Sequence, residues 1–395
     1  MTLWASSGPA SIVCQALIQI TWVWLYSFLR ILFSVYLPER ECFYDFTCLS
    51  WRHCVARSDR HALTNLRAIS FFVNSIKDLG PLKYFLEIEL AYGPKGLFLV
   101  QHKYALEIMD ECRLLGVKPN DFPMEENHKL ALATGTHWVD AWSYHWLMGR
   151  LIYLTITYLM YAMQPIFSVS SCRHLEKNMN AACRVLHYIK GSPDCEIVIH
   201  AHTDLQLIGY CDSDWSVCPI TRRSLIEYLV TLGDSLISRK TKKQTTVSWS
   251  STEAQYRSMA AVTSELVWLK SLLSSFGIFY TQATHLFCDS QAALHVAKNP
   301  IFHECTKHIE IDCHFVCERY HSRELDLSYI PSKMQPADIF TKALVTRQFQ
   351  YLRCKLGMVN LHAPTRGGVL RKLCIIRKVS YCWYYVIIFC DNILW

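Results

Sequence analysis

Between residue 204 and about residue 345, short apolar runs alternate with longer helical stretches, and this alternation restricts the possible folds most strongly. "LIGYC" predicts a strand, and two more strand-like runs flank the turn at Gly233-Asp234. A long helix is expected next, because apolar residues recur every three or four positions at Met259, Val262, Leu266, Leu269, Leu273 and Phe276. "THLFC" and "ELDLSYI" predict strands, whereas "SQAALHVAK", "KHIEIDCHFVCERYH" and "QPADIFTKAL", which opens at Pro336, predict helices. Strands followed by alternating helices and strands predict an α/β fold with a mixed sheet.

Residues 76 to about 203 carry a more mixed pattern. "YFLEIEL" and "LFLVQ" flank Gly93, Pro94 and Gly96, which is typical of a β-hairpin. "HKYALEIMDECRLLG" predicts a helix that ends at Gly116, and "NMNAACRVLHYIKG" predicts another that ends at Gly191. Residues 1 to about 70 and the tail beyond about residue 362 show no helical or strand period.

The composition is typical of a folded protein from a reducing compartment. Hydrophobic residues make up 51% of the 395 residues, which is enough for a large core, and the net charge of +7 permits nucleic-acid binding without requiring it. The 18 cysteines show no repeated spacing, so we expect free thiols and a cytoplasmic or nuclear location. Polar residues interrupt the apolar stretch 12–29, and the apolar patch 381–390 is too short for a bilayer. We predict no membrane span, although the N-terminal stretch keeps a membrane association open.

Four carboxylates lie where predicted strands end or predicted helices begin: Asp212, Glu253, Asp289 and Asp338. Each has a purely structural explanation, respectively a turn, a capping box with Ser250, a helix N-cap and the helix dipole. Together they occupy the class of position at which an α/β sheet collects its ligands. Oxygen ligands alone select hard cations such as Mg²⁺ or Mn²⁺. The pattern therefore favours a cation site.

The same residues carry a resemblance to a known family. "LIGYCDSDW", "KTKKQTTVSWSSTEAQYRSMA", "HLFCDSQAALHVAKNPIFHECTKHIEIDCHF" and "YIPSKMQPADIFTKAL" resemble the ribonuclease H domain of copia-type LTR-retrotransposon polyproteins. These motifs keep the family's order over most of residues 204–362. Upstream, "IKDLGPLKYFLEIEL", "LFLVQHKYALEIMDECRLLGVKP" and "GRLIYLTIT" resemble the C-terminal part of the same polyprotein's reverse transcriptase.

The resemblance implies a fold, a site and a substrate. The fold is a ribonuclease H-like mixed sheet with flanking helices at 204–362, preceded by a truncated α+β reverse-transcriptase palm/thumb segment at 71–203. Segments 1–70 and 363–395 stay unassigned. By the resemblance, Asp212, Glu253, Asp289 and Asp338 match the family's set of ligands for two Mg²⁺ (or Mn²⁺) ions. The implied partners are an RNA–DNA hybrid and other parts of the polyprotein, with no small-molecule cofactor.

Departures from the family pattern leave a second function open. No two adjacent aspartates occur in the chain, so we expect no polymerase activity. Val217 and Glu227 stand at positions where the family usually has glycine, and we expect a β-branched side chain at such a turn to strain the backbone beside Asp212. The alternative is therefore an impaired retrotransposon remnant that binds nucleic acid without cleaving it.

Two further clusters have a functional and a structural interpretation. "SRKTKKQ" holds Arg239, Lys240, Lys242 and Lys243, which we interpret as a phosphate-contacting arm rather than a solvated loop, with Arg222 and Arg223 as weaker candidates. His303, Cys305, His308, Cys313, His314 and Cys317 suggest a zinc site, but their spacing fits no finger motif. Cys313 and Cys317 share a helical face with Ile309, so we expect them to pack in the core.

Overall fold

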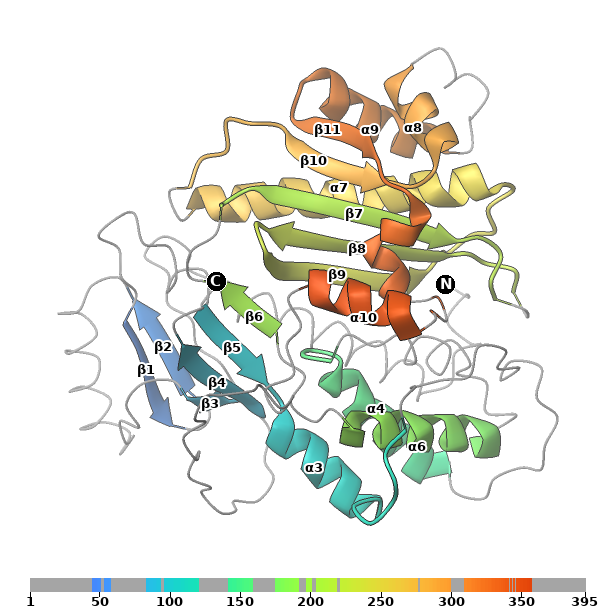
Figure 1. The fold of residues 1–395 in the computed structure, drawn as a ribbon. Coiled ribbons are helices and arrows are strands. Elements are labelled where there is room, and N and C mark those ends of the chain that lie inside the picture. The colour runs from blue at the N-terminus through green and yellow to red at the C-terminus, as the bar shows by residue number, and fades with distance from the viewer. Residues whose placement is uncertain are drawn as a thin grey trace, which may run out of the picture.

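The computed structural model describes fourteen stretches of the chain, namely residues 45–50, 53–57, 83–93, 96–120, 141–158, 175–191, 197–200, 204–218, 221–275, 278–299, 309–340, 342, 344 and 346–356. Within them, the two larger sheets lie one above the other in the view of Figure 1, and helices lie beside both.

The larger sheet has five strands in the order β11-β10-β7-β8-β9. Strands β7 (Leu207–Asp214), β8 (Leu225–Leu232) and β9 (Ser235–Lys243) form an antiparallel meander. Strands β10 (Thr284–Cys288) and β11 (Leu325–Tyr329) are parallel to β7 and to β10, respectively. Gly233, which joins β8 to β9, has φ of 54°, a left-handed conformation that glycine adopts without strain. This sheet confirms the predicted mixed α/β fold.

Helix α7 (Ser251–Ser275) crosses one face of this sheet, as the apolar stripe predicts (Figure 1). Met259, Val262, Leu266, Leu269 and Leu273 are all buried in its contact with the strands. A side chain at Gly209 would meet Leu266, Val262 and Leu286, so the helix approaches β7 closely at that point. The opposite face is covered by α10 (Thr346–Lys355) and by the 3₁₀ helix η5 (Pro336–Phe340).

The segment "QPADIFTKAL", for which the sequence predicts an α-helix, forms a shorter helix with the narrower 3₁₀ geometry. It forms a single 3₁₀ segment, η5, whose five residues are all buried. The other two predicted helices are α8 (Gln291–Lys298) and α9 (Glu310–His321), and both pack beside the β10–β11 edge of the sheet (Figure 1).

Upstream lies a four-stranded antiparallel sheet in the order β3-β4-β5-β6. Its strands are Tyr84–Phe85, Ile88–Gly93, Gly96–Val100 and Ile197–His200, and the pair Gly93–Gly96 closes the predicted hairpin. The helices beside it are α3 (His102–Glu111), α4 (Ala141–Leu154) and α6 (Leu175–Gly191). Helix α6 ends at the predicted glycine. Helix α3 ends earlier than Gly116, because Arg113 takes a positive φ of 57° and Leu114 N–H closes on the Met109 carbonyl.

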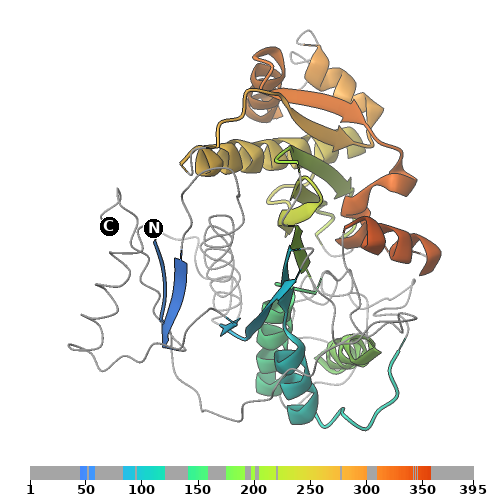
Figure 2. The same ribbon diagram turned by 60° about the vertical axis from the view of Figure 1, so that its left-hand side comes forward.

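A two-stranded antiparallel hairpin, β1 (Asp45–Ser50) with β2 (His53–Arg57), lies in the segment for which the sequence showed no period. Figure 2 shows this hairpin apart from the other sheets. Elsewhere the core runs across the predicted boundary at residue 203, because Leu97 and Ile199 of the upstream sheet belong to the same buried cluster as Leu207 and Ile237. In the described part of the chain, no helix is long and apolar enough to cross a membrane.

Candidate active site

Two of the predicted carboxylates are brought together by the pairing of parallel strands. Cys211 of β7 lies in register with Cys288 of β10, and an aspartate follows each of these cysteines. Asp212 and Asp289 therefore lie next to each other at the same edge of the sheet. Asp289 does not cap helix α8, since the Ser290 hydroxyl accepts the Ala293 N–H instead. The capping explanation for Asp289 is thus wrong.

A third carboxylate, Asp338 of η5, reaches Asp212 from the layer above the sheet. The Lys342 ammonium lies between them, 2.6 Å from Asp212 Oδ2 and 2.8 Å from Asp338 Oδ1. Both carboxylate side chains are only 4% exposed, whereas the lysine side chain is 33% exposed. Burial of two acidic groups side by side is costly unless a cation or a proton compensates their charge.

The three aspartates have displaced pKa values that fit this arrangement. Burial alone would raise the pKa of Asp212, but the Lys342 ammonium and hydrogen bonds from Asp338, Lys342 and the backbone hold it below its usual value. Burial, followed by the hydrogen bond with Asp212 and its charge, raises the pKa of Asp338 to about 8. Burial and the charge of Asp212 also raise the pKa of Asp289. Asp212 and Asp338 therefore share one proton at neutral pH.

Two glutamines, which the sequence analysis did not single out, hold the site in place. Gln255 of α7 donates from Nε2 to the Cys211 carbonyl at 3.2 Å and to Asp289 Oδ1 at 3.3 Å. Gln335 donates to the same Cys211 carbonyl at 2.9 Å, and its Oε1 accepts no hydrogen bond from the described residues. On the exposed side, the Ser332 hydroxyl donates to Asp289 Oδ2 at 2.7 Å. Both glutamines lie inside motifs quoted for the family resemblance, but nothing in the sequence shows that their amides are buried beside the aspartates.

Glu253, the fourth predicted carboxylate, has a structural role at the start of α7. Its carboxylate accepts the Trp249 N–H at 2.7 Å and forms an ion pair with Arg257 at 2.8 Å. Its own N–H donates to the Ser250 hydroxyl, as in a capping box. The residue of α7 that touches Asp289 is Gln255, not Glu253. A metal role for Glu253 stays a prediction.

The predicted strain at Val217 is wrong. The left-handed backbone conformation falls on Ser216, with φ of 55°, while Val217 has no positive φ and is half-exposed. Glu227 does not lie in a turn either. It is fully buried within β8, directly opposite Asp212, so the two side chains lie on the same face of the sheet.

The basic run does not form a single arm. It lies in strand β9, where successive side chains point to opposite faces, so Lys240 and Lys242 leave one face while Arg239 and Lys243 leave the other. Arg239 is half-buried, contacts the Tyr158 carbonyl at 3.5 Å and lies over the Phe340 ring. Arg222 and Arg223 are exposed in the β7–β8 turn.

The structure supports core packing for part of the cysteine-histidine cluster. Ile309, Cys313 and Cys317 are each buried, and the first two belong to one core cluster, while the exposed His314 faces Glu310 at 3.9 Å. His303, Cys305 and His308 lie outside the described residues. As the described side chains stand, no group of three or more His, Cys, Asp or Glu residues is arranged to hold a metal ion.

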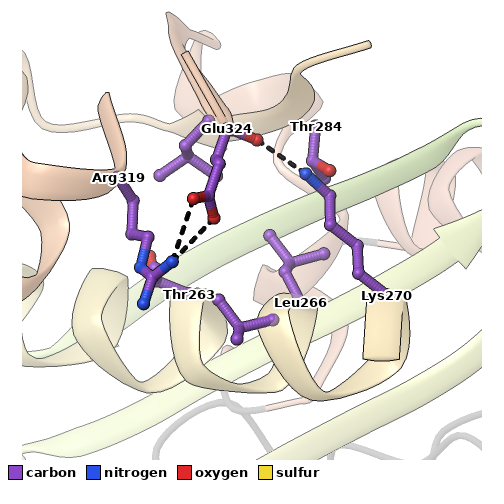
Figure 3. Close-up of a pocket in the computed structure, with 8 residues that line it drawn as sticks. Thr263, Leu266, Lys270, Thr284, Arg319 and Glu324 are labelled. Atoms are coloured by element: carbon purple, nitrogen blue, oxygen red, sulfur yellow. Dashed lines mark hydrogen bonds and ion pairs between the residues drawn. The ribbon is translucent and has the colours of Figure 1, made fainter. Parts of the chain in front are cut away.

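One small cavity lies away from the aspartates, near the beginning of β10. Arg319 and Lys270 both point at Glu324 there (Figure 3). Arg319 forms an ion pair with the Glu324 carboxylate, and the Lys270 ammonium donates to the Glu324 backbone carbonyl at 2.8 Å. Its volume of about 10 Å³ leaves no room for a ligand. The aspartates lie at the other end of β10, so this cavity has no part in their chemistry.

Comparisons with known proteins place the chain in a family. No family model matches it. It is 38% identical over 301 residues to the "Retrovirus-related Pol polyprotein from transposon RE2" and 36% identical over 291 residues to that of transposon RE1, both from Arabidopsis thaliana. These matches cover 75% and 73% of this chain but only 20% of each relative, so the chain spans about a fifth of their length. An uncharacterized mitochondrial protein of the same plant is 36% identical over 49% of this chain and 81% of its own length.

Two solved structures also show a likeness. The N-terminal ribonuclease H domain of a Mycobacterium tuberculosis protein, fused to maltose binding protein, is 10% identical, with a TM-score of 0.25 over 38% of this chain and 98% of that chain. Ribonuclease H1 from Halobacterium salinarum is 12% identical, with a TM-score of 0.22 over 33% and 90%. On the strength of the polyprotein relatives, the chain belongs to the retrovirus-related Pol polyproteins of copia-type transposons.

Proposed function

We propose that residues 204–362 form a metal-dependent ribonuclease H that hydrolyses the RNA strand of an RNA–DNA hybrid. One observation carries the proposal: Asp212, Asp289 and Asp338 come from three separate parts of the chain and converge around the partly exposed Lys342 ammonium. Buried carboxylates in such a cluster need a cation or a proton to compensate their charge, and a bound divalent metal ion would supply that compensation. We propose no polymerase step, because the chain contains no pair of adjacent aspartates.

The donor atoms fit a hard cation such as Mg²⁺ or Mn²⁺ by their chemistry, although in the described part of the chain their present arrangement, with Lys342 between two carboxylates, does not hold one. The donor set is made of carboxylate oxygens, and the buried Gln335 Oε1, which has no hydrogen-bond donor among the described residues, lies close to the Cys211–Asp212 segment. Asp212, Asp289 and Asp338 would hold the first ion. A second ion would need Glu253, and its carboxylate would first have to leave Arg257.

The chain's own residues orient the reaction. When bound, divalent cations lower the pKa of an attacking water and stabilise the leaving oxygen. Gln255 and Ser332 fix the Asp289 carboxylate, and Ser258 fixes the backbone carbonyls of Asp212 and Glu227 at 2.7 and 3.0 Å. The RNA 2′-hydroxyl would distinguish the substrate strand from DNA.

The test compares two aspartates that lie two residues apart. Asp212→Asn removes a charged ligand of the proposed site, so Mg²⁺-dependent cleavage of a hybrid should fall by orders of magnitude. Asp214→Asn is the matched control, since Asp214 ends β7 beyond the buried cluster and its variant should keep most of the activity. Equal activity of the two variants would refute the assignment.

An impaired remnant remains the second candidate, and two observations favour it. An ammonium occupies the space between Asp212 and Asp338, and an amide, Gln255, touches Asp289 where another carboxylate would strengthen a cation site. Such a protein would bind the hybrid through its basic residues and leave it intact. The same assay decides, because hybrid binding without Mg²⁺-dependent cleavage would establish the remnant.

A further inference from the structure

Lys342 is placed where a metal ion would have to bind. Its Nζ atom lies 2.6 Å from Asp212 Oδ2 and 2.8 Å from Asp338 Oδ1, so it touches an oxygen of both carboxylates. It follows Asp338 by four residues, and its backbone N–H donates to the Asp338 carbonyl at 3.0 Å. The local backbone therefore directs this lysine back over the aspartate of its own segment.

We infer that Lys342 is a tethered counter-ion, which occupies the cation position between Asp212 and Asp338 and must leave before a divalent metal ion binds there. This inference rests on the proposed cation site. A Mg²⁺ ion needs carboxylate oxygens at about 2.0–2.1 Å and in octahedral order, which an ammonium in contact with the same oxygens prevents. The two positive charges would also repel each other at this short range.

The lysine can leave without disturbing the core. Its side chain is 33% exposed, whereas both carboxylates are 4% exposed, so the path from the site to solvent runs along the lysine itself. Lysine carries its charge on a flexible four-carbon stem, and the ammonium regains water when it swings outward. The aspartates stay in place, because β7 and η5 hold their backbones.

The consequence is a competition between two cations. Without divalent metal, the ammonium compensates the buried carboxylates and stabilises the fold. With metal, the same ammonium lowers the apparent metal affinity, because binding includes the loss of the two ion pairs. Removing the lysine charge should therefore lower the stability of the metal-free protein and raise its affinity for a divalent metal ion. Loss of an ion pair with a purely structural role would lower the stability without raising the metal affinity.

The experiment uses the full chain with Lys342→Gln and Mn²⁺ as the probe. Calorimetric titration should show Mn²⁺ affinity rising by about tenfold or more relative to the unaltered protein. In EDTA the variant should melt at a lower temperature, and Mn²⁺ should raise its melting temperature more than it raises that of the unaltered protein. If the variant folds only when Mn²⁺ is present, the inference is equally supported.

Two control variants test whether the effect depends on the positive charge at position 342 and on the location of that charge. Lys342→Arg keeps the positive charge, so its Mn²⁺ affinity should stay near that of the unaltered protein. Lys333→Gln removes an exposed lysine charge near the same surface, and should leave both Mn²⁺ affinity and melting temperature nearly unchanged.

Two outcomes would overturn the inference. One is a Lys342→Gln protein that binds Mn²⁺ no more tightly than the unaltered chain, and the other is a variant that stays unfolded with and without Mn²⁺. Failure of the proposed function looks different. In that case Lys342→Gln binds Mn²⁺ more tightly, as inferred, while neither protein cleaves an RNA–DNA hybrid.

Discussion

Asp212 and Asp338 share one ammonium and one hydrogen bond, so the protonation of each depends on the other. The pKa of Asp212 is lowered and that of Asp338 is raised to about 8, which means that one proton stays in the pair at neutral pH. A divalent cation would release that proton, because it favours both carboxylates in the ionised form. Metal binding should therefore become stronger as the pH rises.

The same pKa values predict how stability depends on pH in the absence of metal. A carboxyl whose pKa is raised on folding binds more protons in the folded state, so the free energy of unfolding falls as the pH rises from about 4, the unfolded value, to about 8. Asp289 acts in the same direction, whereas the lowered pKa of Asp212 gives stability that is complete above the unfolded value of about 4 and is lost as the pH falls below it. Urea unfolding in EDTA at a series of pH values should show this decline.

Asp338→Asn should flatten the decline, since the amide does not titrate. Asp234→Asn, which alters an exposed carboxylate in the β8–β9 turn, serves as the control and should keep the slope. An identical slope in all three proteins would show that Asp338 does not hold the proton.

Gln255 leads to a second prediction for a single residue. Its amide lies 3.3 Å from Asp289 Oδ1, so Gln255→Glu places another carboxylate beside Asp289. In EDTA the variant should be less stable because like charges repel, and its Mn²⁺ affinity should rise by about tenfold because the site gains an anionic ligand. Calorimetry measures both effects. Gln348→Glu in α10 adds the same charge elsewhere, and a similar gain in affinity there would contradict the role of Gln255.

At the scale of elements, strand β9 contains the basic run and determines the directions in which its side chains point. Lys242 and Lys243 both line one open cavity beside Arg257, but their side chains leave opposite faces of the strand, so we expect a bound duplex to contact only one of the two ammonium groups. Replacing both by alanine should therefore lower the slope of log affinity against log salt by about 0.9, the value for one phosphate contact, rather than by twice that amount. Hybrid binding at several salt concentrations measures the slope, and a loss near 1.8 would contradict the alternation.

The elements also show what a single sequence can and cannot predict. Helix α7 was predictable because one apolar stripe of its residues lies against the sheet, and strands β7, β10 and β11 because apolar runs end at polar residues. The roles of Glu253 and Gln255 were not, since both lie in the first turns of α7 and only three-dimensional packing decides which one faces Asp289. Likewise, the positive φ at Ser216 depends on the hydrogen bonds of its turn, which no composition rule fixes.

For the whole molecule, the two sheets share one hydrophobic cluster, so the upstream segment contributes to the stability of the ribonuclease H-like part. Strand β6 contacts β9, and the His200 N–H donates to the Ser235 hydroxyl at 2.9 Å. The polyprotein relatives extend well beyond this chain, which covers about a fifth of their length. The predicted boundary at residue 203 thus divides the sequence but not the core.

A substitution in the upstream sheet tests this coupling. Leu97→Ala removes a fully buried side chain of β5, and should lower the free energy of unfolding by about 2–5 kcal/mol in one cooperative transition of the whole chain. Leu106→Ala in α3 deletes the same atoms at a position that is 37% exposed, and should cost much less. Denaturant unfolding followed by tryptophan fluorescence reports the transition. A second transition that Leu97→Ala leaves unchanged would mean that the two parts unfold independently.

If aspartates from separate elements form one catalytic cation site, cleavage must depend on Asp289. The measurement is cleavage of an RNA–DNA hybrid, labelled separately on each strand, by the full chain and by Asp289→Asn at several Mg²⁺ concentrations. We expect Mg²⁺-dependent cutting of the RNA strand alone, and a loss of orders of magnitude in the variant, because Asp289 lies beside Asp212 at the ends of paired strands. Undiminished cleavage by Asp289→Asn, or cleavage that does not depend on Mg²⁺, would contradict this expectation.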